Sequence, residues 1–215
     1  MRRSRPGCAL RVVGIPWSVL AMMLVCAAMS ACGQEHLKFA LHDISGHMPP
    51  LQFDLTDQDG KPVTAGDYRG KVVLLYFGYT SCPDACPTTL AKLTNAMHTL
   101  GGEAEQVRVL FVSVDPKRDT AAVLKRYVAY FGPQFIGLRS ASDGPLDALT
   151  RRYRVAYHRE PPDRTGYYAV DHSSAIFIFD RDSKARVLAD GTEAVPTIVH
   201  DLRQLLGDHA AARTW

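Results

Sequence analysis

The chain has 215 residues, 47% of them hydrophobic, with 25 Lys and Arg against 22 Asp and Glu and a formal net charge of +3. This length suits one ordinary domain plus a targeting segment, and the composition excludes a disordered or fibrous protein. Four of the basic residues lie within residues 1–31, which contain no Asp or Glu, so the remainder has 21 basic and 22 acidic residues and a net charge of −1. A body with this charge and without a basic stripe excludes nucleic acid as an expected partner.

The N-terminal segment has the pattern of an export signal. Arginines precede an uncharged run over residues 12–29, and the small-residue stretch Met29-Ser30-Ala31-Cys32 ends the segment. This pattern predicts a cleaved signal peptide over residues 1–31. The stretch also resembles a bacterial lipobox, with Met29 where leucine is usual, so Cys32 is the candidate for lipid attachment. The alternative is an uncleaved transmembrane anchor, because the apolar run is just long enough to span a bilayer.

Both alternatives keep the arginines inside and place the body outside the cytoplasmic membrane. We therefore expect a membrane-anchored protein on the periplasmic or extracytoplasmic face. Residues 32–50 have mixed polarity and end in Pro-Pro, and we expect them to form a tether.

From Leu51 onwards the sequence predicts a series of strands and helices. Alternating apolar and polar residues around Asp59-Gly60 indicate a hairpin, and long apolar runs indicate buried strands. The predicted elements are the hairpin in 51–64, a strand at 71–79, a helix carrying Leu90 to Leu100, a strand at 107–115, a helix carrying Val123 to Phe131, a short strand at 135–139, a helix at 145–155, paired strands at 174–180 and 185–190, and a last helix carrying Ile198 to Leu206.

This order predicts one α/β domain over residues 51–215, with a mixed central sheet flanked by helices and an N-terminal β-hairpin extension. The strand at 71–79 delivers two cysteines directly to the start of a helix, which is typical of the thioredoxin-like fold. The charged stretch at 157–168 is expected to be a loop.

Two cysteines lie four positions apart in one short stretch, Cys82-Pro-Asp-Ala-Cys86-Pro87. Cys8 and Cys26 lie in the predicted signal, so the exported body retains only this pair beside Cys32. Pro87 suits the first turn of a helix, where free backbone N–H groups favour thiolates. Residues four apart on a helix have Cβ atoms about 5–6 Å apart, which suits two sulfurs converging on a metal ion and still permits a disulfide bond. A purely structural disulfide would close a very small loop and add little stability.

A metal ion would need a third ligand, and a histidine beside two thiolates forms a soft set suited to copper. In thioredoxin-like folds the loop before a central strand faces the cysteines, and proline usually stands there. Here that loop reads Val170-Asp171-His172-Ser173 and precedes the strand at 174–180, which favours His172 as the ligand. Pro196 is a less suitable match for the missing proline because it precedes a helix. His172 is thus favoured as the third metal ligand among the five histidines of the folded body, which are His98, His158, His172, His200 and His209.

Three segments together resemble the Sco/SenC family, which helps to assemble the copper centre of cytochrome c oxidase. They are FGYTSCPDACPTTL at 77–90, FVSVDPKRDT at 111–120 and YYAVDHSSAIFIFD at 167–180, and the likeness runs from about Leu51 to Leu206. The resemblance implies a thioredoxin-like metallochaperone that delivers copper to, or prepares, the CuA centre of oxidase subunit II. By position the copper ligands, for Cu(I) or Cu(II), would be Cys82, Cys86 and His172. Another copper chaperone or a thiol reductant is a further candidate partner.

A second hypothesis treats Cys82 and Cys86 as the redox-active pair of a thiol–disulfide oxidoreductase acting on cysteines of the oxidase or of other exported proteins. Copper delivery alone requires no enzyme activity, whereas this hypothesis does. A thiol peroxidase is disfavoured, because nothing within the cysteine segment supplies an activating arginine. Tyr79, Tyr168 and Asp171 are candidates for lining or supporting the site.

Overall fold

The computed structural model describes the backbone of residues 37–211, and side chains as far as residue 207. An eight-stranded sheet in the order β1-β10-β9-β4-β5-β6-β2-β3 lies at its centre, beside a separate two-stranded sheet, β7-β8. The strands are β1 (His42–Asp43), β2 (Asp54–Asp57), β3 (Pro62–Thr64), β4 (Val72–Gly78), β5 (Val107–Ser113), β6 (Phe135–Arg139), β7 (Tyr157–Arg159), β8 (Val170–His172), β9 (Ile176–Phe179) and β10 (Ala185–Ala189). The helices are η1 (Ala65–Tyr68), α2 (Ala85–Leu100), η2 (Gly101–Gln106), α3 (Ala121–Ala129), α4 (Asp143–Arg152) and α5 (Val195–Ala211).

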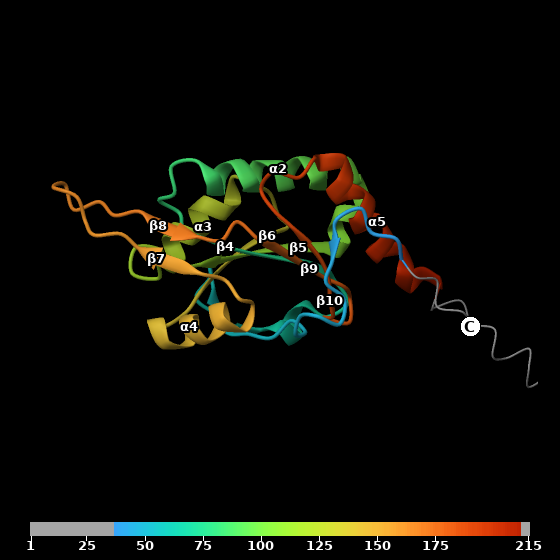
Figure 1. Ribbon diagram of the computed structural model, residues 1–215, viewed down its shortest axis with the longest axis horizontal. Coiled ribbons are helices and arrows are strands. Elements are labelled where there is room, and N and C mark those ends of the chain that lie inside the picture. The colour runs from blue at the N-terminus through green and yellow to red at the C-terminus, as the bar shows by residue number, and fades with distance from the viewer. Residues whose placement is uncertain (1–36, 212–215) are drawn as a thin grey trace, which may run out of the picture. The chain divides into compact units, whose positions relative to one another are not determined.

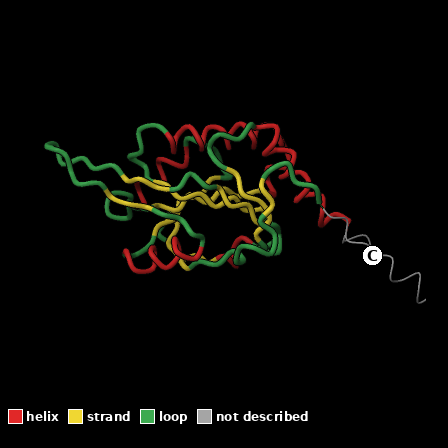
Figure 2. The backbone as a smooth tube through the Cα atoms, in the orientation of Figure 1, coloured by secondary structure: helices red, strands yellow, loops and turns green. Residues whose placement is uncertain are grey.

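The central sheet is mixed, as the sequence predicts. Strands β4, β5 and β6 are parallel, whereas β9 joins β4, and β2 joins β6, in antiparallel pairing. The sheet lies as a layer between helices, with α2 and α5 on one face and α4 on the other (Figures 1 and 2). The thioredoxin-like α/β fold is therefore confirmed, and the hairpin β2–β3 forms the expected N-terminal extension at the sheet edge.

The core forms where both faces of the sheet are covered. Every residue of β4 is buried, and so is every residue of β5 except Arg108, because parallel central strands have helices on both sides. Helix α2 packs its apolar stripe, including Leu90, Leu93 and Met97, against this layer. The helix ends at Leu100, and Gly101 follows with a φ of 60°. Glycine adopts a positive φ readily because it has no Cβ.

Residues 38–50 differ from the tether that the sequence predicts. Strand β1 pairs with β10, and Leu41 and Ile44 are buried. The backbone N–H groups of Ala40 and Leu41 donate to the buried carboxylate of Asp201 in α5, at 2.9 and 2.8 Å. This carboxylate binds the segment to the domain, so the compact unit begins at Lys38 instead of Leu51.

The charged stretch expected to be a loop contains a hairpin. Strands β7 and β8 are antiparallel, with Tyr157 opposite His172 and Arg159 opposite Val170. The hairpin extends from the domain beside the N-terminal end of α2 (Figure 1). Its connection, residues 160–169, contains two prolines and three charged residues, which conceal the short strands in the sequence.

The signal peptide predicted for residues 1–31, and with it Cys32, lies outside the described residues. Within the described part, no helix combines the length and the apolar character needed to cross a bilayer.

Candidate metal centre

The cysteine segment follows β4 at the edge where that strand ends. Cys82 lies in the turn after Tyr79, to whose carbonyl its N–H donates at 3.2 Å, and is half-buried. Cys86 lies in the first turn of α2 and is fully buried. The Cys86 N–H donates to the Cys82 sulfur at 3.4 Å, so a free N–H of the helix start is directed at this sulfur, as the sequence predicts.

Gly78, the last residue of β4, makes room for the buried sulfur. A Cβ at this position would lie 2.8 Å from Cys86 Sγ and 2.6 Å from Cε2 of Phe111. Both neighbours are fully buried, so neither can move aside without disturbing the core. A glycine is therefore required here because Cys86 packs directly against the strand.

Burial dominates the acid–base behaviour of Cys86. It raises the pKa of the Cys86 thiol to about 12. At neutral pH the free sulfur is thus a thiol, which differs from the thiolate that the helix start alone would favour. Sγ is 3.7 Å from the hydroxyl of Tyr76, and burial also raises the pKa of that hydroxyl. A metal ion that binds Cys86 must displace its proton.

His172, at the end of β8, completes the group. Its Nε2 lies 3.3 Å from Cys86 Sγ. Its Nδ1 lies 2.9 Å from the carbonyl oxygen of Ser173, and because a carbonyl can only accept, Nδ1 carries the proton. Nε2 is then left with its lone pair directed toward the sulfurs, which is the tautomer that a metal ligand needs.

The rings of two tyrosines surround the imidazole. Tyr79 meets it edge-on at 6.0 Å between centroids, and Tyr76 does so at 6.2 Å. Tyr79 therefore lies beside the site, as the sequence suggests. Asp171 is exposed in β8, and the ring of Tyr168 stacks on Arg118.

Ligand atoms of Cys82, Cys86 and His172 all lie within 4.8 Å of one another. Metal–thiolate bonds are about 2.3 Å long, so three ligands in a plane around one ion would be about 4 Å apart. The group thus fits a single ion with small adjustments. Two sulfurs and one imidazole nitrogen favour copper or zinc over oxygen-seeking cations.

The other candidate histidines lie elsewhere. His98 is in the last turn of α2, and His158 and His200 are exposed with acidic neighbours, Glu160 and Asp201. The side chain of His209 is outside the described residues. In the described part of the chain, only the group containing His172 has three potential ligand atoms together.

The residues that hold this site together are not evident from the sequence. Asp119 and Arg118, in the segment after β5, bond to the cysteine turn and to the β7–β8 hairpin respectively. The only sequence signal is the FVSVDPKRDT stretch, whose likeness to the family does not indicate what these residues contact.

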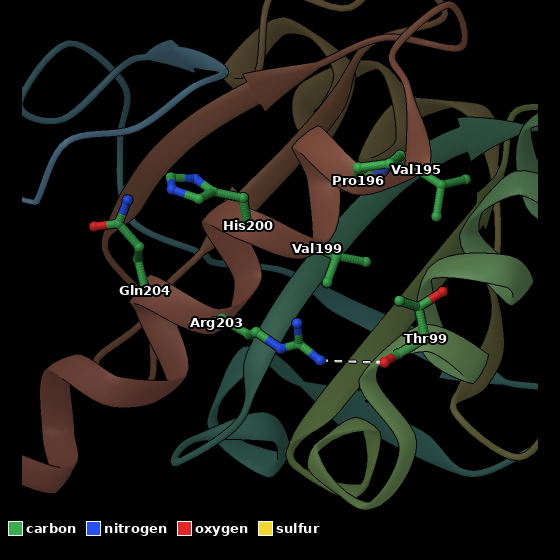
Figure 3. A pocket seen from close by; sticks show the side chains of 7 residues that line it. All are labelled: Thr99, Val195, Pro196, Val199, His200, Arg203 and Gln204. Carbon is green, nitrogen blue, oxygen red and sulfur yellow. Dashed lines mark hydrogen bonds between the residues drawn. The ribbon is translucent and has the colours of Figure 1, made fainter.

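Apart from the candidate metal centre, a hollow lies between the end of α2 and α5. It has a volume of about 550 Å³ and is lined by Thr99, Val195, Pro196, Val199, His200, Arg203 and Gln204 (Figure 3). Its polar groups already have protein partners, since Arg203 binds Glu103 and the Thr99 carbonyl and His200 contacts Asp201. Pro196 is the second residue of α5, as expected of a helix-start proline.

Comparison with known proteins points to one family. The SCO1/SenC family model matches residues 48–207. A SCO2-like protein of Rickettsia felis is 38% identical over 133 residues, which make up 61% of this chain and 64% of that protein. The match therefore spans less than two thirds of that relative's length.

Solved structures agree with this assignment. Bradyrhizobium japonicum ScoI, with copper bound, is 36% identical and aligns with a TM-score of 0.66 over 73% of this chain and 98% of its own. The apo Sco1 protein of Thermus thermophilus is also 36% identical, with a TM-score of 0.69 over 80% of this chain and 99% of its own.

Proposed function

Because this chain belongs to the SCO1/SenC family, we propose that it binds one copper ion through Cys82, Cys86 and His172 and acts in the assembly of cytochrome c oxidase. In the finer form of this proposal, the protein delivers copper to, or prepares, the CuA centre of oxidase subunit II. The observation that carries it is the placement of two sulfurs and an imidazole nitrogen within 4.8 Å of one another. The solved relative with copper bound supports the choice of metal.

The ligand set accepts copper in either oxidation state. Two thiolates and a neutral imidazole contribute two negative charges, so the centre carries −1 with Cu(I) and is neutral with Cu(II). Burial favours the neutral centre, whereas the N–H groups at the start of α2 favour the anion. A site with only three ligands, one of them a half-buried sulfur, suits a copper ion that must later be released to a partner.

Copper titration of the reduced domain tests the ligand assignment. We expect one copper ion per chain, and His172→Ala should weaken binding by about 100-fold, as loss of about 3 kcal/mol of ligand binding would. His158→Ala, on the same hairpin but exposed, is the matched control and should bind like the wild type. An unchanged affinity in His172→Ala would remove the histidine from the site.

The proposal includes attachment at the outer face of the membrane, through lipid on Cys32 or through an N-terminal transmembrane segment. It is supported by the residue pattern of positions 1–32. Metabolic labelling with a radioactive fatty acid separates the two forms, since Cys32→Ser abolishes labelling only in the lipoprotein.

A thiol–disulfide oxidoreductase is the second candidate function. The observation that favours it is the difference between the cysteines, since Cys82 is half-buried while Cys86 lies fully buried behind it. Cys82 can thus attack a partner disulfide and Cys86 can resolve the mixed disulfide. In this case either cysteine variant abolishes reduction of an oxidase-derived disulfide peptide, and His172→Ala spares it. The two roles are compatible, because copper binding requires the reduced pair.

A further inference from the structure

The segment Asp115–Asp119, between β5 and α3, contacts the two elements that carry the candidate metal ligands. These are the cysteine turn after β4 and the β7–β8 hairpin. The segment follows directly on Val114, whose N–H donates to the Gly78 carbonyl at 2.8 Å, so it lies beside the end of β4. Asp115 and Asp119 are fully buried, and the Asp119 N–H donates to the Asp115 carbonyl at 3.0 Å. Two charged side chains in so short a buried turn need specific partners.

Asp119 supports the cysteine side. Its carboxylate accepts from the Thr80 hydroxyl at 2.6 Å, from the Thr80 N–H at 3.1 Å and from the Ser113 hydroxyl at 2.6 Å. Thr80 stands two residues before Cys82, so these bonds hold the turn in which Cys82 lies.

Arg118 supports the histidine side. Its Nη1 donates to the Tyr168 carbonyl at 2.9 Å, its Nε pairs with the Asp115 carboxylate, and its guanidinium lies 3.6 Å from the centre of the Tyr168 ring. The Tyr168 hydroxyl in turn donates to Asp115 at 2.9 Å. Tyr168 stands four residues before His172 on the same arm of the hairpin.

The same guanidinium also faces the tyrosine beside the imidazole. It lies 5.5 Å from the ring of Tyr79, which meets His172 edge-on, and 5.6 Å from the ring of Tyr167. Arg118 is therefore surrounded by residues of the hairpin and of the β4 end. The other arm contributes Arg159, which donates to the Val114 carbonyl at 3.1 Å and to Asp143 at 2.9 Å.

The hairpin depends on these side chains for its position. Strands β7 and β8 pair with each other and, among the described residues, with no strand of the central sheet. A backbone ladder thus holds His172 within the hairpin, and residues 173–175 join it to β9, which pairs with β4. Among the described residues, side-chain bonds add the remaining contacts between the hairpin and the end of β5, so the distance from Nε2 to the sulfurs is set in part outside the ligand residues.

We propose that Arg118 is a positioning residue of the metal centre, which holds the β7–β8 hairpin closed so that His172 reaches the two cysteines. This inference rests on the proposed copper function for its main readout. Lysine cannot replace this arginine, because it lacks both the planar face that stacks on Tyr168 and the forked donors.

A double-mutant cycle between Arg118→Met and His172→Ala tests the proposal, with copper affinity of the reduced protein measured by competition against a chelator. Residues that orient a ligand typically change metal affinity by about 10- to 100-fold when replaced. We expect a loss of this size from Arg118→Met alone and no further loss in the His172→Ala background. Arg152→Met is the matched control, since Arg152 lies 5.9 Å from the ring of Tyr153 and donates to the Pro50 carbonyl, and it should leave affinity unchanged.

Hydrogen exchange provides a readout that needs no metal. In the apo protein, Arg118→Met should speed exchange of the paired amides of β7 and β8 while the amides of β4 and β5 remain protected. If Arg118→Met fails to fold, Tyr168→Phe removes only the hydroxyl that binds Asp115 and should show the same pattern at smaller size.

Two results would overturn the proposal. One is wild-type copper affinity and wild-type hairpin exchange in folded Arg118→Met. The other is an equal loss of affinity with and without His172, which would mean that Arg118 acts on the cysteines or on the whole fold. Failure of the proposed copper function gives a different result. His172→Ala alone would then leave copper affinity unchanged, whereas Arg118→Met would still speed hydrogen exchange in β7 and β8.

Discussion

Cys86 shows how one residue's surroundings determine its chemistry. The start of α2 favours a thiolate, but full burial against Gly78, Tyr76 and His172 outweighs it and raises the pKa of the thiol to about 12. A buried charge is costly when no counter-charge accompanies it, and a metal ion supplies that counter-charge. The Cys86 sulfur therefore remains a protonated thiol until a metal ion binds it.

A proton balance tests this at the residue scale. At pH 7, well below the Cys86 pKa, copper binding should release a proton from Cys86, so affinity should rise with pH by about tenfold per unit for this proton. Calorimetry in buffers of different ionisation enthalpy measures the release, and Cys86→Ser should release fewer protons than the wild type. An affinity that does not change with pH would contradict the assignment of Cys86 as a ligand.

The raised pKa of Cys86 should also affect how the stability of the apo protein depends on pH. The folded pKa of Cys86 lies above the ordinary value of 9.0, so folding retains a proton that the unfolded chain loses. This contribution is fully present below about pH 9 and is lost as pH rises toward 12. The free energy of unfolding should fall less steeply over that range in Cys86→Ser than in the wild type, as denaturant titration would measure.

At the scale of elements, the end of β4 and the start of α2 act as one unit. The apolar residues of β4 bury the strand, Gly78 allows the sulfur to approach it, and Pro87 suits the first helical turn. The β7–β8 hairpin is a different kind of element, since it is short and is attached through side chains.

Gly78→Ala tests the close approach between strand and helix. A methyl group 2.6 Å from Phe111 and 2.8 Å from the Cys86 sulfur should destabilise the protein by about 1–3 kcal/mol and weaken copper binding. Gly144→Ala in α4, where an added Cβ meets nothing within 4 Å, is the control and should be neutral or slightly stabilising. Thermal unfolding and copper competition provide the two measurements, and equal stability of the two variants would count against the packing argument.

At the scale of the whole molecule, the candidate metal centre joins parts that are distant in the chain. Cys86 and His172 are 86 positions apart, and they meet at one end of the sheet. A ligand that binds both should therefore link the hairpin to the rest of the domain and stabilise the folded state.

Copper removal tests that link. At a free copper concentration 1,000 times the dissociation constant, binding should add about 4 kcal/mol and raise the melting temperature by roughly 8–16 °C. A chelator should reverse the shift and speed hydrogen exchange in β7 and β8 more than in β4. Equal changes in all strands would indicate that the hairpin is not the linked element.

Much of this arrangement could be predicted from local patterns. The continuous apolar runs of β4 and β5 specify buried strands, and Cys82, Cys86 and Pro87 specify a reactive turn at a helix start, because these signals lie within a few residues of one another. The sequence favours His172 through its place before a strand in a thioredoxin-like fold and through the likeness of residues 167–180 to the Sco/SenC family. Short strands such as β1 and β7 leave too weak a pattern, since two or three residues cannot show a period.

The sequence by itself determined the fold class and the position of the cysteine pair, and it predicted one histidine among several as their partner. Only the tertiary structure decided that Nε2 and Sγ come within 3.3 Å, that burial keeps Cys86 protonated, and that Arg118 and Asp119 support opposite sides of the centre. The physical reason is the separation in sequence between the residues that determine each property. Hydrophobic periodicity depends on neighbouring residues of the chain, whereas desolvation and ligand geometry depend on side chains that folding brings together from distant segments.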